Sequence, residues 1–206
     1  MPNKLIDIQA VLTRLAEVRP IFHSEADFQF AFAWVAAQMV EGLQVRLEAR
    51  QPNGRELDLL VADKSFKNRI AIEFKHLTTA WDGSVNGERF RHGKPLAPNL
   101  GRRGIVRDIE RVEGFVKDGL ATAGAVVVIS NNDIYWKAPG KRYCSSINYR
   151  IHDGAVLSGM LSWHPKNPAW TGHHSTLVGS YTAAWSPYSD PAGGPGPFQT
   201  LVFETS

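Results

Sequence analysis

The stretch RELDLLVADKSFKNRIAIEFKHL, residues 55–77, contains two short apolar runs on either side of a polar turn. This pattern is typical of a β-hairpin. Each run nevertheless holds an acid, Asp58 in the first and Glu73 in the second, and Lys75 follows two residues after Glu73. The aliphatic residues around them leave little polar surface on either face. The sequence therefore predicts a central hairpin that buries charged groups, and charges are seldom buried without a partner.

The expected pairing of the two strands brings these charges together. Side chains two apart on a strand share a face, so Glu73 and Lys75 should point the same way. If the hairpin closes symmetrically about Ser65 and Phe66, Asp58 lies opposite Glu73, at the separation of about 4.5 to 5.5 Å usual for facing side chains. Two carboxylates at that separation repel each other, and protonation, a nearby cation or a divalent metal ion relieves the repulsion. The alternative is an ordinary salt bridge on the surface of an edge hairpin, with Lys75 as the cation.

The segments before the hairpin predict two helices and a strand. Residues 4–18 place apolar side chains at helical spacing. In residues 24–43, SEADFQFAFAWVAAQMVEGL, Ser24 is the expected N-cap of a second helix. Glu25 falls at the edge of the buried stripe of this helix, although an acid in the first turn also stabilises a helix through its dipole, whatever the function. Residues 43–50 predict a strand that joins the hairpin in an antiparallel meander.

The segments after the hairpin are less regular. Residues 78–103 show no periodicity and are rich in Gly, Pro, Asn and Arg, which indicates a long connection. Residues 104–119 predict a helix, and the apolar run at 123–130 predicts a strand buried on both faces. From about residue 147 onward short strands alternate with turns, and SPYSDPAGGPGP, residues 186–197, indicates an exposed loop. The aromatic residues of this part are expected to form the core of a small sheet.

Length and composition set the class of protein. The chain has 206 residues, of which 43% are hydrophobic and 21% charged. This is enough for one sizeable core, and a single domain over residues 1–206 is expected. One cysteine, Cys144, excludes an internal disulfide framework. No apolar run reaches transmembrane length, and the N-terminal segment lacks a continuous apolar signal sequence. The expected location is therefore cytoplasmic, without a membrane partner.

The order of these residues and elements resembles the PD-(D/E)XK nuclease superfamily, which includes many restriction endonucleases and the archaeal Holliday junction resolvases. The resemblance lies in a helix that begins with an acid, Asp58 on the second strand, Glu-x-Lys on the third, and then a helix and a buried strand. It covers roughly residues 20–131, and it departs from the family pattern because no Pro precedes Asp58. It implies an α/β fold with a restriction-endonuclease-like central mixed sheet flanked by helices. Residues 140–206 would then be a β-rich C-terminal extension of this core.

The resemblance also implies a site and an activity. Asp58, Glu73 and the backbone carbonyl of Phe74 would hold Mg²⁺, or Mn²⁺ in its place, and Glu25 would join them directly or through water. Lys75 would orient and help to activate the attacking water, while the metal would stabilise negative charge on the phosphate. The implied activity is metal-dependent hydrolysis of phosphodiester bonds by an endonuclease, with DNA as the favoured substrate. A homodimer would suit an enzyme that cuts both strands of a duplex.

Positive charge is concentrated beside the implied site. The whole chain has a formal charge of +3 and a pI near 9.1. Residues 76–107 alone contain six Lys or Arg against two acids. Contacts of such residues with the phosphate backbone supply much of nonspecific affinity for nucleic acid. A solvated, flexible loop is the alternative. The six candidate nucleic-acid-binding residues are Arg89, Arg91, Lys94, Arg102, Arg103 and Arg107.

Other residues near the implied site receive weaker assignments. Trp81 and Phe90 could stack on bases, but anchoring of the loop to the core is favoured. None of the seven His has convincing ligand spacing, and only His76 lies near the implied site. Asp108 and Arg111 are expected to pair with neighbouring side chains, with support of the site as the alternative.

Two other functions are compatible with the sequence. The chain could be a module derived from a nuclease that binds nucleic acid or a protein without cutting, although the complete Asp, Glu and Lys set argues against it. It could also be a nuclease that is active only inside a larger defence or toxin assembly. The sequence does not distinguish DNA from RNA, or one metal ion from two.

Overall fold

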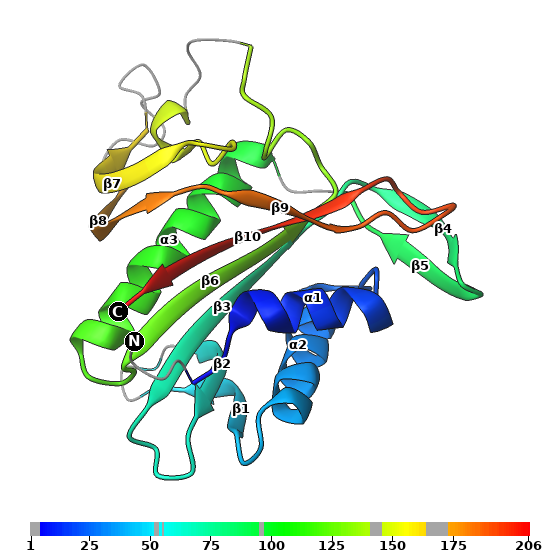
Figure 1. Ribbon diagram of the computed structural model, residues 1–206. Helices are drawn as coiled ribbons and strands as arrows, with labels where there is room; N and C mark the ends of the chain where they lie inside the picture. The colour runs from blue at the N-terminus through cyan, green and yellow to red at the C-terminus, as the bar shows by residue number, and fades with distance from the viewer. Residues whose placement is uncertain (1–4, 52–53, 55, 95–96, 141–145, 164–172) are drawn as a thin grey trace.

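The computed structural model describes residues 5–51, 54, 56–94, 97–140, 146–163 and 173–206 (Figure 1). Cys144 lies outside these residues. The described elements form a mixed α/β fold around a six-stranded sheet of order β1-β2-β3-β6-β10-β9, and two further sheets have two strands each. In the central sheet β3 and β6 are parallel, and the other described pairs are antiparallel. No described helix combines the length and the apolar character needed to cross a bilayer.

The elements of the first half follow the sequence pattern closely. Their bounds are α1 Ile8–Val18, α2 Glu25–Met39, β1 Gln44–Arg50, β2 Glu56–Ala62 and β3 Arg69–Leu77. The hydroxyl of Ser24 accepts a hydrogen bond from the Asp27 backbone N–H at 3.2 Å, which confirms the predicted cap of α2. Helix α1 begins four residues later than the pattern predicted, because Asp7 caps it.

The hairpin of β2 and β3 closes as predicted. Ala62 pairs with Arg69, and Leu59 pairs with Ile72, so the centre of the hairpin lies between Ser65 and Phe66. The hairpin does not lie at the edge of the sheet, because β1 covers its outer side and β6 its inner side. An ordinary salt bridge on an exposed edge therefore does not explain its charges.

The segment between β3 and β6 differs from the prediction. It contains β4 Trp81–Val85, β5 Glu88–His92 and α3 Pro98–Lys117, followed by β6 Ala123–Ser130. The predicted long connection over residues 78–103 was therefore wrong. Strands β4 and β5 form a hairpin whose turn residues Asn86 and Gly87 both have positive φ, 51° and 83°. A tight two-residue turn requires this backbone conformation, and Asn-Gly adopts it readily. Helix α3 begins at Pro98 rather than at residue 104, since proline suits the first turn of a helix.

The last third of the chain is β-rich, as expected, but half of its strands complete the central sheet. Its elements are η1 Ile147–Tyr149, β7 Val156–Ser162, β8 His174–Thr182, β9 Trp185–Ser189 and β10 Phe198–Thr205. Strands β7 and β8 form a separate sheet that packs against α3 (Figure 1). Strand β10 pairs with β6, and β9 pairs with β10. The description of residues 140–206 as an extension outside the core was therefore too simple, and the predicted loop at 186–197 includes part of β9.

Two hydrophobic cores lie on opposite faces of the central sheet. Helices α1 and α2 cover one face, where the Phe74 ring meets the rings of Phe28 and Phe32 at centroid distances of 5.2 Å (Figure 1). Helix α3 and the β7–β8 sheet cover the other face. Strand β3 therefore has Phe74 in one core, while its neighbour Glu73 faces the α3 side. This alternation places the charged residues of β3 against a helix.

Candidate active site

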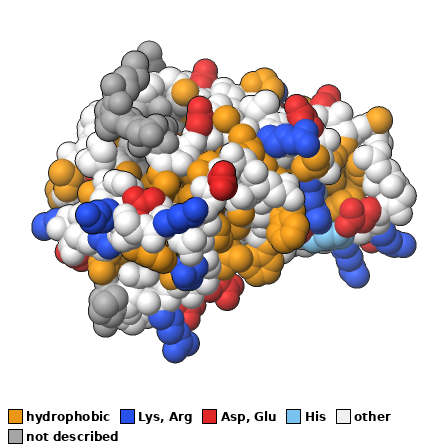
Figure 2. Space-filling model, turned by 60° about the horizontal axis from the view of Figure 1, so that its bottom comes forward, with side chains coloured by type: hydrophobic (Ala, Val, Ile, Leu, Met, Phe, Trp, Pro, Cys, Tyr) orange, Lys and Arg blue, Asp and Glu red, His pale blue; other side chains and the backbone are white. Residues whose placement is uncertain are grey.

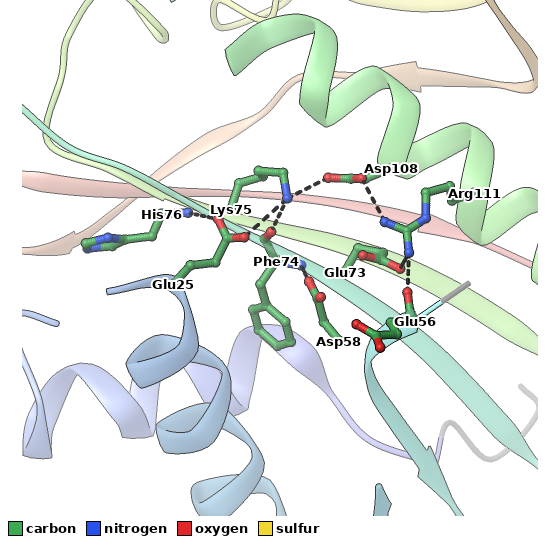
Figure 3. Close-up of polar contacts among 9 residues, drawn as sticks. All are labelled: Glu25, Glu56, Asp58, Glu73, Phe74, Lys75, His76, Asp108 and Arg111. Atoms are coloured by element: carbon green, nitrogen blue, oxygen red, sulfur yellow. Dashed lines mark hydrogen bonds and ion pairs between the residues drawn. The ribbon is translucent and has the colours of Figure 1, made fainter. Parts of the chain in front are cut away.

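The β2–β3 ladder stops where the first acid lies. Its last described pair joins Leu59 and Ile72. At the next position the Asp58 carboxylate accepts a hydrogen bond from the backbone N–H of Phe74 at 2.8 Å (Figure 3). The register thus places Asp58 opposite Glu73, as predicted, and the side chain of Asp58 binds the backbone of β3 where the strands begin to separate.

Glu73 is fully buried and poorly compensated. Its exposed fraction is 0%, and neither carboxylate oxygen has a hydrogen-bond partner among the described residues. Its one described ion pair joins Oε1 to Nη2 of Arg111 at 3.0 Å. Arg111 lies on α3 and also donates a hydrogen bond to the Glu56 carbonyl (Figure 3). The Arg111 guanidinium is therefore the described cation that pairs with Glu73, and the Glu56 carbonyl holds this guanidinium in place.

Lys75 lies at the centre of the cluster. Its ammonium group donates to the Phe74 carbonyl at 2.8 Å and pairs with Asp108 at 2.9 Å and with Glu25 at 3.4 Å. The second oxygen of Glu25 accepts from the His76 backbone N–H at 3.0 Å. The predicted meeting of α2 with the hairpin is therefore confirmed, and Figure 3 shows these groups converging on the Lys75 nitrogen.

Burial and crowding shift the acids toward their protonated forms. Burial, together with the charges of Asp58 and Asp108, raises the pKa of Glu73 to about 9 against the opposing effect of Arg111. Burial also raises the pKa of Asp108, although the cationic Lys75 partly offsets it. The same balance of burial and Lys75 raises the pKa of Glu25. The cluster is therefore short of positive charge when its acids are ionised.

The pKa of Lys75 moves in the opposite sense to that of a buried, isolated lysine. Burial alone would lower it, but the carboxylates of Asp108 and Glu25 together outweigh burial and raise it. Lys75 is therefore an ammonium ion at neutral pH. It can orient a water molecule and stabilise negative charge, but it is a poor proton acceptor.

The donor set suits a hard divalent cation. Carboxylate and carbonyl oxygens are the ligands that Mg²⁺ prefers, and Asp58, Glu73 and the Phe74 carbonyl supply both kinds. The buried Oε2 of Glu73, which has no described hydrogen bond or ion pair, is consistent with a ligand role. The acids are nevertheless not gathered around one point, since no three His, Cys, Asp or Glu side chains of the described ranges form a metal-binding group. Several of them form ion pairs with Lys75 and Arg111 instead of a shared metal site.

Asp108 and Arg111 contribute more to this site than the sequence indicated. They pair with each other across one turn of α3 at 3.5 Å, as expected. Each also contacts a hairpin residue, Asp108 with Lys75 and Arg111 with Glu73. Asp108 and Arg111, three residues apart on α3, thus face Lys75 and Glu73, two residues apart on β3. This matching spacing of opposite charges was the signal in the sequence that could have indicated the contact.

The six candidate nucleic-acid-binding residues divide between two elements. Arg89 and Arg91 lie on β5, with the exposed Lys94 just beyond, and Arg89 pairs with Asp82 at 3.0 Å. The other three lie on α3. Arg102 donates to the Ile134 carbonyl at 2.6 Å, and Arg103 contacts His173.

Arg107 is exposed and lines an open pocket of about 550 Å³ with Glu56, Glu110 and Arg111. The structure therefore places one predicted basic residue beside the Glu73–Arg111 pair. On the face that Figure 2 shows, Lys and Arg side chains are interspersed with Asp and Glu rather than collected in one patch.

The two aromatic residues of the β4–β5 hairpin anchor it, as predicted. Phe90 is 2% exposed, belongs to the core under α1 and α2, and stacks on His23 at a centroid distance of 4.3 Å. Trp81 packs against the same core. His76 lies directly beside the site, and burial, reinforced by the nearby His92, lowers its pKa to about 3. Its ring is therefore neutral at physiological pH.

Comparisons of this chain with family models, with curated proteins and with solved structures find no match. The function is therefore inferred from the residues of the site and from their geometry.

Proposed function

We propose that the protein is a metal-dependent nuclease that hydrolyses phosphodiester bonds, with DNA as the favoured substrate. The observation that supports this most strongly is the meeting of Asp58, Glu73 and Lys75 where β2 and β3 separate. There Glu73 is fully buried and has no hydrogen bond within the part of the chain that the structure describes. Burying such a carboxylate is costly, so a structural role alone explains it poorly. Perturbed acids in a cluster of this kind are typical of functional sites.

The proposed metal ion is Mg²⁺, or Mn²⁺ in its place. Asp58, Glu73 and the Phe74 carbonyl would hold it, and Glu25 would join directly or through water. When bound, the metal would supply stabilisation of the negative charge that develops on the phosphate. Glu73 has to release its proton and exchange its Arg111 contact to serve as a ligand. Arg111 would keep its contacts with the Glu56 carbonyl and Asp108, beside the pocket that it shares with Arg107.

In the proposed reaction Lys75 binds and orients the attacking water. Its ammonium group is held by Asp108 at 2.9 Å, which keeps it charged and fixes its position. The water oxygen forms a bond to phosphorus and releases a proton to solvent, while the bond from phosphorus to the leaving oxygen breaks and that oxygen takes up a proton from solvent. Asp108 is therefore a positioning residue, because it acts on the water through Lys75.

A second candidate function is binding without cleavage, alone or through a larger assembly. Two observations favour it. Arg111 already pairs with Glu73, and Lys75 already pairs with Asp108 and Glu25. Helix α2 also exposes the large apolar side chains of Phe30 and Trp34, at 48% and 69%, which a protein partner could cover.

The test is a cleavage assay on plasmid, single-stranded DNA and RNA with Mg²⁺, Mn²⁺ or EDTA. The wild-type protein is compared with Lys75→Met and with Lys67→Met, which changes an exposed lysine in the β2–β3 turn. We expect metal-dependent cutting that Lys75→Met abolishes and Lys67→Met retains. Absence of cutting on every substrate by a folded protein would support the binding module, and equal cutting by both variants would place the chemistry elsewhere.

A further inference from the structure

A second pocket adjoins the candidate active site on the side of β5. It has a volume of about 230 Å³, and its polar lining comes from His23, His76, Thr78, His92, Lys94 and Tyr135. His76 follows the catalytic candidate Lys75 directly, and its backbone N–H binds Glu25. The pocket therefore begins where the cluster around Lys75 ends. Figure 2 shows histidine surface, in pale blue, between basic and acidic side chains.

Two imidazole rings in the wall of this pocket have unsatisfied nitrogens. His76 and His92 meet edge to face at a centroid distance of 5.5 Å. The Nε2 atom of His92 lies 2.9 Å from the Phe22 carbonyl, which can only accept, so this nitrogen carries a proton. Nδ1 of His92 and Nε2 of His76 are buried and have no described partner. His92 itself is 5% exposed. Buried polar groups usually have partners, so these two nitrogens call for a ligand or an ordered water.

The charge of the pocket lining favours an anionic ligand. Among the described residues, Lys94 is the one Lys, Arg, Asp or Glu that lines the pocket, and the hydroxyl groups of Thr78 and Tyr135 can also donate. Two acids adjoin the lining without belonging to it, since Glu88 binds His23 at 2.8 Å and Glu25 accepts from the His76 backbone N–H at 3.0 Å. A cation would face the Lys94 ammonium, and the described residues contain no metal-binding group of three His, Cys, Asp or Glu side chains. An anion instead meets one ammonium group and several neutral donors.

The size of the pocket limits the anion. Pockets for drug-sized ligands measure about 300 to 1,000 Å³. At about 230 Å³ this pocket is smaller, and it fits a phosphate group with part of its sugar better than a whole nucleotide. Phosphate also provides several acceptor oxygens for converging donors.

We propose that this pocket is a phosphate-binding subsite, which holds a phosphate group of the nucleic-acid substrate next to the one that is cut. The proposal rests on the proposed nuclease function for its substrate, although the subsite itself requires only phosphate binding. Lys94 supplies the charge, while Thr78 and the Nε2–H tautomer of His76 supply hydrogen bonds. An internal phosphate and a terminal 5′-phosphate present the same kind of oxygens to the pocket, and the second experiment separates the two.

The first experiment titrates the protein with inorganic phosphate and follows the ring nitrogens of its histidines by NMR, with chloride at matched ionic strength as the control. We expect the His76 and His92 rings to shift in a saturable way while the exposed His174 ring stays unchanged. In Lys94→Met the phosphate affinity should fall about tenfold, as for a hydrogen bond to a charged group. Rings that do not respond, or that all respond alike, would overturn the subsite. This result does not depend on cleavage.

The second experiment measures binding of short oligonucleotides, with and without a 5′-phosphate, by fluorescence anisotropy in EDTA. Lys94→Met is compared with Lys67→Met, which removes the same charge from the β2–β3 turn. We expect Lys94→Met to weaken binding of both oligonucleotides about tenfold more than Lys67→Met. Weakening confined to the 5′-phosphorylated oligonucleotide would assign the pocket to a terminal phosphate. Equal binding by both variants would refute a substrate subsite, whether or not the protein cuts nucleic acid.

Discussion

The two ends of the β2–β3 hairpin provide opposite environments for a carboxylate. At the turn, Asp63 accepts hydrogen bonds from the backbone N–H groups of Ser65, Lys67 and Asn68 and from two of their side chains. These bonds, led by the Ser65 hydroxyl, lower the pKa of Asp63 to about 2. At the other end, Glu73 has no hydrogen bond among the described residues, and burial raises its pKa to about 9.

Asp63 therefore stabilises the fold, whereas ionised Glu73 does not. Asp63 closes the turn, and its hydrogen bonds account for its presence. Glu73 makes the native state less stable when ionised, because its surroundings are apolar and already hold other acids. A carboxylate that destabilises its own fold is better explained by a functional role. Four predictions test this contrast between Glu73 and Asp63.

The largest expected difference is in catalysis. Glu73→Gln keeps the shape of the side chain but removes its charge, so metal-dependent cleavage should fall by about 10²- to 10³-fold. Asp63→Asn should leave the rate per folded molecule within about twofold, because Asp63 lies in the turn rather than among the groups that converge on Lys75. Initial rates on one substrate, with the folded fraction set by circular dichroism, provide the measurement. A Glu73→Gln protein that cuts normally would remove this acid from the proposed site.

Stability should change in the opposite order. Glu73→Gln removes an acid whose ionised form is disfavoured in the fold, so at pH 7 the free energy of unfolding should rise by about 2 kcal/mol. Asp63→Asn should lower the urea midpoint, because the amide nitrogen cannot accept the hydrogen bonds of the turn. Urea unfolding of both variants beside the wild type measures this. If Glu73→Gln is the less stable of the two, the carboxylate has a structural role after all.

The pH dependence of stability should also differ between Glu73 and Asp63. The folded pKa of Glu73 lies above its ordinary value of 4.5, so the folded state binds an extra proton between pH 4.5 and about 9. Stability from this group is present below pH 4.5 and is lost as the pH rises toward 9, by up to about 1.4 kcal/mol per pH unit. For Asp63 the folded pKa is lowered, so its contribution is present above its ordinary 3.8 and is lost as the pH falls toward 2.

Unfolding midpoints between pH 5 and 9, measured for the wild type and for Glu73→Gln, test the first half of this prediction. The wild type should lose stability relative to the variant as the pH rises. Parallel curves for the two proteins would show that Glu73 ionises at an ordinary pH.

The remaining expected effect is stabilisation by metal. Mg²⁺ at ten to a hundred times its dissociation constant should stabilise the wild type by about 1 to 3 kcal/mol. The gain should increase from pH 7 to pH 9, because the ion replaces a proton on Glu73. Asp63→Asn should retain the thermal shift and Glu73→Gln should lose it. Differential scanning fluorimetry with Mg²⁺, and with Na⁺ at equal ionic strength, decides between these outcomes.

Local patterns were sufficient to predict the hairpin and α2. The symmetry of the turn fixed the register of Asp58 against Glu73, and the cap at Ser24 fixed where α2 begins. Both depend on residues close in sequence, whose geometry is set by strand alternation and by capping. The meeting of Glu25 with Lys75 was predicted from the resemblance and from the stripe of α2.

The parts that were missed depend on one neglected turn signal and on long-range packing. Asn86-Gly87 is a strong hairpin signal, but the polar residues around it concealed β4 and β5. The contacts of Asp108 and Arg111 with β3 could not follow from the pattern of α3 alone, since they depend on how the helix lies across the sheet. The position of β10 beside β6 is likewise a matter of topology, which local propensity does not encode.

The place of β10 in the central sheet has a consequence for how the molecule is made. Strand β6 supports β3 along its whole length, from Ile70 beside Ala123 to Leu77 beside Ser130. Its other edge is filled by β10, which emerges from the ribosome only after β7, β8 and β9. Until then β6 has an open, apolar edge of the kind that invites aggregation. Such distant pairings form slowly, so a nascent chain would complete its central sheet late, which also delays any activity that depends on β3.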